Sequence, residues 1–126
     1  MHIGIVDDNP SVLAMIEAAL KLHGHSSETF SNSSSFLYAL HVARREPPYD
    51  VVIVDLFLDH LSGIDIIEVL QAQRSQLIPT ILISAAEETT LTPIRQRYPV
   101  VPIMQKPFSM RTLLSLVDKV TSRVNV

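Results

Sequence analysis

The stretch Val51-Val-Ile-Val-Asp55 sets four consecutive β-branched residues directly before an aspartate. Such a run is typical of a central strand that is covered on both faces of a parallel sheet. Other short apolar runs alternate along the chain with segments of helical period, which favours βαβ units. We therefore predict an α/β fold with a doubly wound, five-stranded parallel sheet of the flavodoxin-like (βα)5 type. The expected strand order is 2-1-3-4-5.

Five segments carry the strand pattern, and the polarity of the second indicates a sheet edge. They are Ile3 to Val6, Ser26 to Phe30, Val51 to Val54, Thr80 to Ile83 and Val100 to Met104. Asn9 and Pro10 have the residue types of a helix cap and a first helical residue, and Gly24 is suited to end that helix. Ser109 is the predicted cap of the last helix. The fourth helix is predicted to start at Thr92-Pro93 and to stop at Tyr98-Pro99, within about two turns.

The composition bounds the class of protein. A length of 126 residues fits one compact domain, so we expect a single domain over residues 1–126. Apolar residues make up 47% and charged residues 18%, which permits a buried core and excludes disorder. The net charge of −3 provides no basic field for nucleic acid or anionic lipid. Because cysteine is absent, disulfides, thiolate zinc sites and cysteine nucleophiles are excluded.

Acidic residues follow two strands at the same end of the predicted sheet. Asp7 and Asp8 come directly after the first strand, and Asp55 directly after the third. Ligands of open α/β sheets bind beyond the carboxyl ends of the strands, where the strand order reverses. In the predicted order that point lies between strands one and three, so we expect the three carboxylates to converge there. Ser84 ends the fourth strand and Lys106 follows the fifth, at the same edge.

Carboxylates held close together repel one another, and a small hard cation relieves that repulsion. Mg²⁺ prefers one or two carboxylates together with water and phosphate oxygens, so the cluster predicts a magnesium site that receives a phosphoryl group. One carboxylate then serves as the nucleophile, as aspartyl-phosphate chemistry requires. Lys106 supplies positive charge, and the Ser84 hydroxyl is a donor for a phosphoryl oxygen. The simpler alternatives are a helix-capping pair at Asp7 and Asp8 and a satisfied strand-end hydroxyl at Ser84.

Five short motifs carry a resemblance to a known family. They are Ile5-Val-Asp-Asp8, Val54-Asp55-Leu, Ser62-Gly63, Ile83-Ser84-Ala85 and Lys106-Pro107-Phe108. Any one of them is a weak signal, but together their order and separations resemble the receiver domains of two-component response regulators. The resemblance covers essentially all 126 residues.

The resemblance implies a role for each residue of the site. Asp55 would accept a phosphoryl group from a sensor histidine kinase or a phosphotransfer protein, and the resulting change of conformation would control a downstream partner. Ser84 and Lys106 would hold the phosphoryl oxygens. The ligands of Mg²⁺ would be Asp7 (mainly through water), Asp8, Asp55 and the backbone carbonyl of Phe57. Receivers commonly hold the bond equivalent to Lys106–Pro107 in the cis form, which proline makes accessible, and we expect it here.

Three positions depart from the pattern of the family. Asp59 stands where proline is usual, Pro99-Val100 replaces a glycine-alanine pair, and Ile103 replaces the aromatic switch residue. We therefore expect an intact phosphorylation site, with a switch from Ser84 to Ile103 that differs from the usual one. Prolines around the fourth helix predict that this helix is short or distorted, with Ile103 packed inward or against it.

The resemblance also places two side chains beside the path of the water that would hydrolyse the phosphorylated aspartate. They are Phe57 and Ala86, neither of which can hydrogen-bond a water, so we expect a long-lived phosphorylated state. The simpler alternative is that Phe57 turns outward to solvent. Among the five histidines, only His60 lies in the loop after Asp55, where it is placed to approach the rim of the site.

Three other functions stay open. A pseudo-receiver would keep the fold without phosphorylation; the complete catalytic set argues against it, and the irregular segment Glu87 to Ile103 argues for it. A flavin mononucleotide binder would need a hydroxyl- or glycine-rich phosphate loop where this chain has Asp7-Asp8-Asn9-Pro10. A phosphatase or phosphotransferase would need a substrate pocket that 126 residues hardly accommodate. We therefore do not expect an enzyme, beyond catalysis by the domain of its own phosphorylation and dephosphorylation.

The expected partners follow from the same resemblance. They are a histidine kinase or phosphotransfer protein, with the fourth helix, fifth strand and fifth helix as the output surface and a candidate homodimer interface. We expect no direct binding of nucleic acid and no membrane association, because no apolar run approaches the ~18 residues of a membrane span. We expect a cytoplasmic location. An effector domain C-terminal to Val126 is compatible with the sequence, which identifies neither the kinase nor the effector.

Overall fold

The computed structural model describes residues 1–73 and 78–124. Within them, five parallel strands form one sheet in the order β2-β1-β3-β4-β5, which confirms the predicted fold class and strand order. The strands are β1 (His2–Val6), β2 (Ser26–Phe30), β3 (Val51–Asp55), β4 (Thr80–Ser84) and β5 (Ile103–Gln105). The helices are α1 (Pro10–Leu22), α2 (Ser33–Val42), α3 (Gly63–Gln73), α4 (Glu88–Arg97) and α5 (Met110–Val124).

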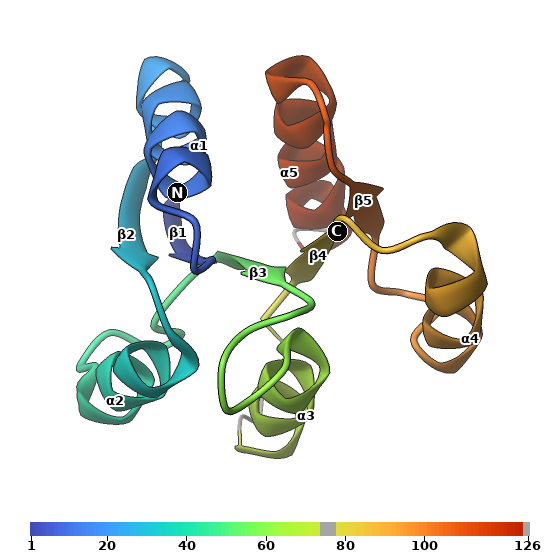
Figure 1. Cartoon of the computed structure of the whole chain (residues 1–126). Helices are drawn as coiled ribbons and strands as arrows, with labels where there is room; N and C mark the ends of the chain where they lie inside the picture. The colour runs from blue at the N-terminus through green and yellow to red at the C-terminus, as the bar shows by residue number, and fades with distance from the viewer. Residues whose placement is uncertain (74–77, 125–126) are drawn as a thin grey trace.

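The helices cover both faces of the sheet (Figure 1). Helices α1 and α5 pack on one face, and α2, α3 and α4 lie on the other. The polar strand β2 forms one edge, as predicted, and β5 forms the opposite edge. None of the helices formed by the described residues is long and apolar enough to cross a membrane.

Strand β3 contributes to two hydrophobic cores because its side chains alternate between the faces of the sheet. Val51 and Ile53 belong to the core under α1 and α5, whereas Val52 and Val54 belong to the core under α2, α3 and α4. All four side chains are fully buried. Burial of one such aliphatic side chain contributes about 1.5–3 kcal/mol to stability. The β-branched run therefore forms the doubly covered central strand that the sequence predicts.

The predicted helix caps are present. The side chain of Asn9 accepts hydrogen bonds from two backbone N–H groups in the first turn of α1, and Pro10 is the first helical residue. Beyond the end of α1, Gly24 has a φ of +81°, which glycine adopts without steric cost. Ser109 Oγ accepts a hydrogen bond of 3.1 Å from the Thr112 N–H at the start of α5. These caps fix the short connections that lead from β1 and β5 into their helices.

The start of α4 differs from the prediction. The sequence predicts a start at Thr92 and Pro93, but the helix begins at Glu88, so Pro93 lies inside it. Proline removes one backbone hydrogen bond there. The longer helix, however, brings Leu91 into the same buried core as Tyr98, and burial of these side chains outweighs the missing bond. Ten residues make just under three turns of about 3.6 residues each, so the helix is longer than the two turns predicted but stays below three turns.

Strand β5 is shorter than predicted. The sequence predicts a strand from Val100 to Met104, but pairing with β4 begins at Ile103. The Val101 N–H instead donates to the Tyr98 carbonyl in a turn, and Pro102 has no N–H to donate, so the segment before Ile103 does not extend the strand. Ile103 is partly buried against the core under α2, α3 and α4, as predicted.

Polar side chains tie the end of α4 to α3. The Tyr98 hydroxyl donates to Glu68 Oε1 at 2.7 Å, and a guanidinium nitrogen of Arg97 donates to the same oxygen at 3.1 Å. The Arg97 guanidinium also lies over the Tyr98 ring, 5.3 Å from its centroid. The position of the C-terminal end of α4 is therefore fixed by polar contacts as well as by burial.

Gly63, the first residue of α3, lies against the backbone at the end of β3. A Cβ atom at this position would be 2.5 Å from the Asp55 carbonyl oxygen and 2.8 Å from Leu82 Cδ1. The Gly63 N–H donates to the Leu56 carbonyl at 2.8 Å. Helix α3 therefore packs directly on the residue that ends β3, and only a residue without a side chain permits this approach.

Substitution Gly63→Ala should lower the free energy of unfolding by about 1–3 kcal/mol, because the added methyl group overlaps fixed backbone. Urea unfolding followed by circular dichroism measures the difference. A Gly63→Ala variant as stable as the parent would contradict the close approach.

Candidate functional site

The three aspartates converge at the carboxyl ends of two neighbouring strands. Asp7 and Asp8 follow β1, and Asp55 is the last residue of β3, which pairs with β1 in the sheet. One carboxylate oxygen from each residue lies within 4.8 Å of the other two. Asp7 and Asp55 are buried and Asp8 is exposed. The cluster that the sequence predicts at the reversal of strand order is therefore present, with one side open to solvent.

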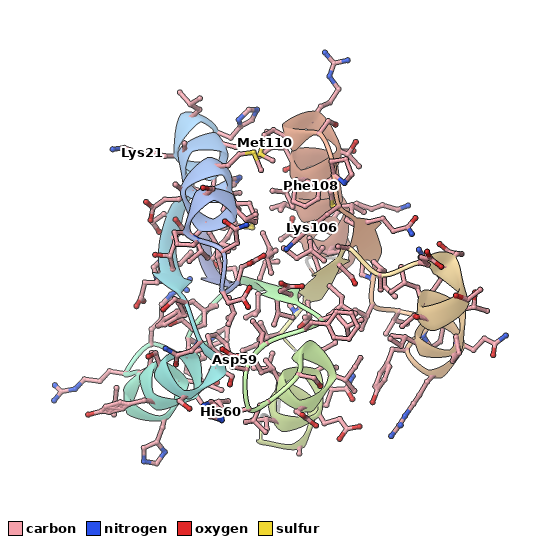
Figure 2. The ribbon with its side chains drawn as sticks, in the orientation of Figure 1. Lys21, Asp59, His60, Lys106, Phe108 and Met110 are labelled. Carbon is pink, nitrogen blue, oxygen red and sulfur yellow. The ribbon has the colours of Figure 1, made fainter. Side chains whose placement is uncertain are left out.

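Lys106 lies between the two buried carboxylates. It follows β5 and reaches towards the middle of the sheet (Figure 2), where its Nζ donates to Asp7 Oδ2 at 2.9 Å and to Asp55 Oδ2 at 3.2 Å. The Lys106–Pro107 peptide bond is cis, as predicted. Burial acts to lower the pKa of the Lys106 ammonium, but the carboxylates of Asp7 and Asp55 outweigh burial and raise it. Lys106 therefore stays charged in the site.

Backbone N–H groups hold the buried carboxylates in place. The Asn9 N–H donates to Asp7 Oδ1 at 2.8 Å, and the Phe57 N–H donates to the Asp55 carboxylate. Burial raises the pKa of the Asp55 carboxyl, and the negative charge of Asp7 raises it further, although Lys106 and the Phe57 N–H act in the opposite direction. Ionised Asp55 is thus under repulsion that an added cation would relieve.

Ser84 occupies the position next to this cluster. It is the fully buried last residue of β4, and Asp55 pairs with Ile83 one residue before it. Its Oγ accepts a hydrogen bond of 2.9 Å from the Ala86 N–H. A hydroxyl that accepts this bond keeps its own hydrogen for donation to another acceptor. The strand-end role and the proposed phosphoryl-binding role of Ser84 are therefore compatible.

Other residues in the loop after β3 lie away from the charged cluster. Asp59 and His60 are exposed between α2 and α3, and Figure 2 shows His60 well away from Lys106. The Ser33 hydroxyl of α2 donates to the Asp59 carbonyl at 3.3 Å, which ties the loop to α2. His60 has a φ of +72°, in the left-handed region that non-glycine residues seldom adopt. His60 therefore does not join the site.

The structure places the remaining predicted residues at the edge of the site. The Phe57 side chain is 58% exposed and turns to solvent, which matches the simpler alternative for this residue. Ala86 is partly buried against the core under α2, α3 and α4. Gln105 was not among the predicted residues. Its Nε2 donates a hydrogen bond to the Ala86 carbonyl at 3.2 Å. The sequence does carry a signal for Gln105. It is a polar residue two positions after Ile103, so the two side chains share one face of the strand.

Carboxylate oxygens are the ligands that a hard divalent cation prefers. A hydroxyl beside them is a hydrogen-bond donor for a phosphate oxygen. Three carboxylates face a single ammonium group in the cluster, so negative charge is in excess. Both oxygens of Asp7 already accept hydrogen bonds, whereas Asp8 is exposed. The residues present therefore fit a divalent cation, with the exposed Asp8 better placed than the buried Asp7 for direct contact.

Comparisons with known proteins identify the family of the chain. The family model of the response regulator receiver domain matches residues 3–118. The chain is 35% identical over 83 residues to the probable transcriptional regulatory protein TcrX of Mycobacterium tuberculosis, a match that covers 66% of this chain and 33% of TcrX. It is 28% identical over 117 residues to protein PilH of Pseudomonas aeruginosa, covering 92% and 93% of the two chains. The chain therefore spans about a third of the length of TcrX but nearly all of PilH.

A solved structure supports the fold alone. The receiver domain of the Francisella response regulator 1452 superposes with a TM-score of 0.83 at 21% sequence identity, over 98% of each chain. The shared architecture is thus maintained although most of the side chains differ.

Substitution Asp55→Asn should stabilise the fold in the absence of divalent cations. Because the pKa of Asp55 is raised on folding, the native state holds more protons than the unfolded chain just above the ordinary aspartate pKa, and stability falls as the pH rises through that window. The amide variant escapes this loss. Its Tm should therefore equal that of the parent at low pH and exceed it at neutral pH, by roughly 2–5 °C for each kcal/mol of relieved repulsion.

The exposed Asp59 offers a matched control, because Asp59→Asn removes a carboxylate of the same loop from outside the cluster. The Tm of Asp59→Asn should not rise above that of the parent between low and neutral pH. Thermal unfolding in chelator at several pH values measures both variants. A parent more stable than Asp55→Asn at neutral pH would contradict the repulsion argued for the site.

Proposed function

Because the chain belongs to the response regulator receiver domain family, we propose that Asp55 accepts a phosphoryl group and that the domain thereby acts as a switch in two-component signalling. The observation that carries this proposal is the contact of Lys106 Nζ with the buried carboxylates of both Asp7 and Asp55. It joins a nucleophile, a metal-binding cluster and a fixed positive charge at one edge of the sheet.

The nucleophile in this proposal is a carboxylate oxygen of Asp55. It forms an O–P bond with the phosphoryl group as the bond between phosphorus and the donor breaks, and the donor leaves with that electron pair and takes up a proton. The Phe57 N–H and Lys106 orient the carboxylate before the transfer. Little covalent chemistry is required of the protein, because positioning and charge stabilisation supply most of the catalysis of phosphoryl transfer.

The proposed cofactor is Mg²⁺, held by Asp8, Asp55, the backbone carbonyl of Phe57 and, through water, Asp7. The excess of carboxylates over ammonium groups in the cluster supports this assignment. When bound, the cation supplies the charge neutralisation that lets an anionic phosphoryl group approach the aspartates. Lys106 contributes a positive charge of its own, and the Ser84 hydroxyl contributes a hydrogen-bond donor.

The proposed output starts at Ser84. A phosphoryl group on Asp55 would draw the Ser84 hydroxyl from its contact with Ala86, and the loop between β4 and α4 would follow. Ile103 packs under α4 and would adjust by sliding rather than by the rotamer change of an aromatic ring. We propose the surface of α4, β5 and α5 as the output face and as a homodimer interface.

The proposed phosphodonor is a sensor histidine kinase or a phosphotransfer protein, and the proposed setting is the cytoplasm. The name of TcrX refers to transcriptional regulation, and that protein is about three times as long as the matched stretch. We propose that residues 1–126 form one domain, which acts on a separate partner or on an attached effector domain. With a net charge of −3, the domain itself is not proposed to bind nucleic acid.

Acetyl phosphate with Mg²⁺ should add the mass of one phosphoryl group to the parent protein and none to Asp55→Asn, because the amide lacks the nucleophilic oxygen anion. Asp59→Asn retains the site and should be modified like the parent. Intact-protein mass spectrometry reads all three. A phosphoryl adduct on Asp55→Asn would exclude Asp55 as the acceptor, and a parent that stays unmodified would favour a pseudo-receiver.

The double substitution Phe57→Asn and Ala86→Glu should shorten the lifetime of the phosphorylated state. Neither parent side chain can hydrogen-bond the attacking water, and a positioned polar group commonly accelerates such a step by about 10²-fold. Loss of the adduct after removal of the donor, in Mg²⁺, measures the decay. Val100→Glu, at a residue that is 72% exposed, adds a carboxylate elsewhere and should leave the decay unchanged. Equal decay of parent and double variant would show that these side chains do not set the lifetime.

A further inference from the structure

Gln105 makes a contact that the proposed phosphoryl transfer does not use. Its side-chain Nε2 donates to the carbonyl oxygen of Ala86 at 3.2 Å. Gln105 ends β5 and is the register partner of Ser84, while Ala86 lies in the loop between β4 and α4. The bond therefore joins the residue directly before Lys106 to the loop directly after Ser84.

Both backbone polar groups of Ala86 are engaged by this part of the structure. Its N–H donates to Ser84 Oγ at 2.9 Å, and its carbonyl accepts from Gln105. The backbone is fixed on the strand side as well, because the Lys106 N–H donates to the Ser84 carbonyl at 2.7 Å. The same residue, Ala86, therefore contacts the Ser84 hydroxyl through its N–H and the Gln105 side chain through its carbonyl oxygen.

The side of the sheet on which Gln105 lies agrees with this contact. Side chains alternate along a strand, so Ile103 and Gln105 share one face and Met104 lies on the other. Met104 belongs to the core under α1 and α5, whereas Ile103 packs against the core under α2, α3 and α4. Figure 1 shows β5 at the edge of the sheet beside α4. Gln105 therefore contacts the β4–α4 loop from the face on which α4 packs.

We propose that Gln105 is a positioning residue that holds the β4–α4 loop in its unphosphorylated arrangement, through Ala86, and so sets how readily Ser84 turns towards a phosphoryl group. This inference rests on the proposed function. A bond made in only one of two arrangements favours that arrangement, and its loss raises the population of the other. The apparent affinity for a ligand of the second arrangement then rises with that population.

The test compares the parent with Gln105→Met, which keeps a side chain of similar length and removes the amide donor. Beryllofluoride, a phosphoryl analogue, is titrated in Mg²⁺. Its affinity should rise by roughly two- to tenfold in Gln105→Met, as expected for the loss of one hydrogen bond between neutral groups. Without beryllofluoride, hydrogen exchange at the Ala86 amide should accelerate by a similar factor, because the loop opens more often.

The direction of the change separates positioning from damage, because a merely structural defect would weaken binding of the analogue rather than tighten it. Gln71→Met removes an exposed glutamine of α3 and should change neither measurement. Unchanged affinity and unchanged exchange in Gln105→Met would overturn the proposal, as would weaker binding. A parent that fails to bind beryllofluoride would instead contradict the proposed function, and exchange at Ala86 would then decide the loop contact alone.

Discussion

The Lys106 ammonium lies 2.9 Å from a carboxylate oxygen of Asp7 and 3.2 Å from one of Asp55, and both of these aspartates are buried. Two carboxylates at this separation would destabilise the edge of the sheet without a positive charge between them. The lysine that balances them is 51 residues from Asp55 in the chain and reaches it from the far side of β4. The contact therefore requires the whole parallel sheet, with β1, β3 and β5 in their observed order, and much of the structure serves to hold these three groups in place.

That dependence explains why the site was predictable from the sequence. Strand ends are marked by where an apolar run stops, and the order of strands decides which ends are neighbours, so Asp7, Asp8 and Asp55 are placed without side-chain detail. Asn9-Pro10 and Ser109 carry local capping chemistry that acts independently of tertiary packing. The capping features follow rules with a range of a few residues and the placing of the aspartates follows from strand order, and the structure agrees with both.

The features that the sequence did not predict depend on contacts between distant segments. The early start of α4 follows from burial of Leu91, which overrides the local preference of Pro93 to begin a helix. The end of α4 is held by a contact between Tyr98 and Glu68, 30 residues apart. The Gln105 contact with Ala86 likewise depends on the register between β4 and β5. Local patterns carry no information about such partners.

Gly63 has a consequence for how proteins with this architecture can diverge. The segment after Asp55 packs with its backbone against the backbone of Gly63, so the position of Asp55 depends little on the identity of most neighbouring side chains. The side chains of Phe57, Asp59 and Val100 are exposed and do not contribute to this backbone packing. We therefore expect substitutions on the loops and the outer helix surfaces to leave the position of Asp55 unchanged. The same fold can in this way be shared at 21% sequence identity, because packing of backbone against backbone constrains few side chains.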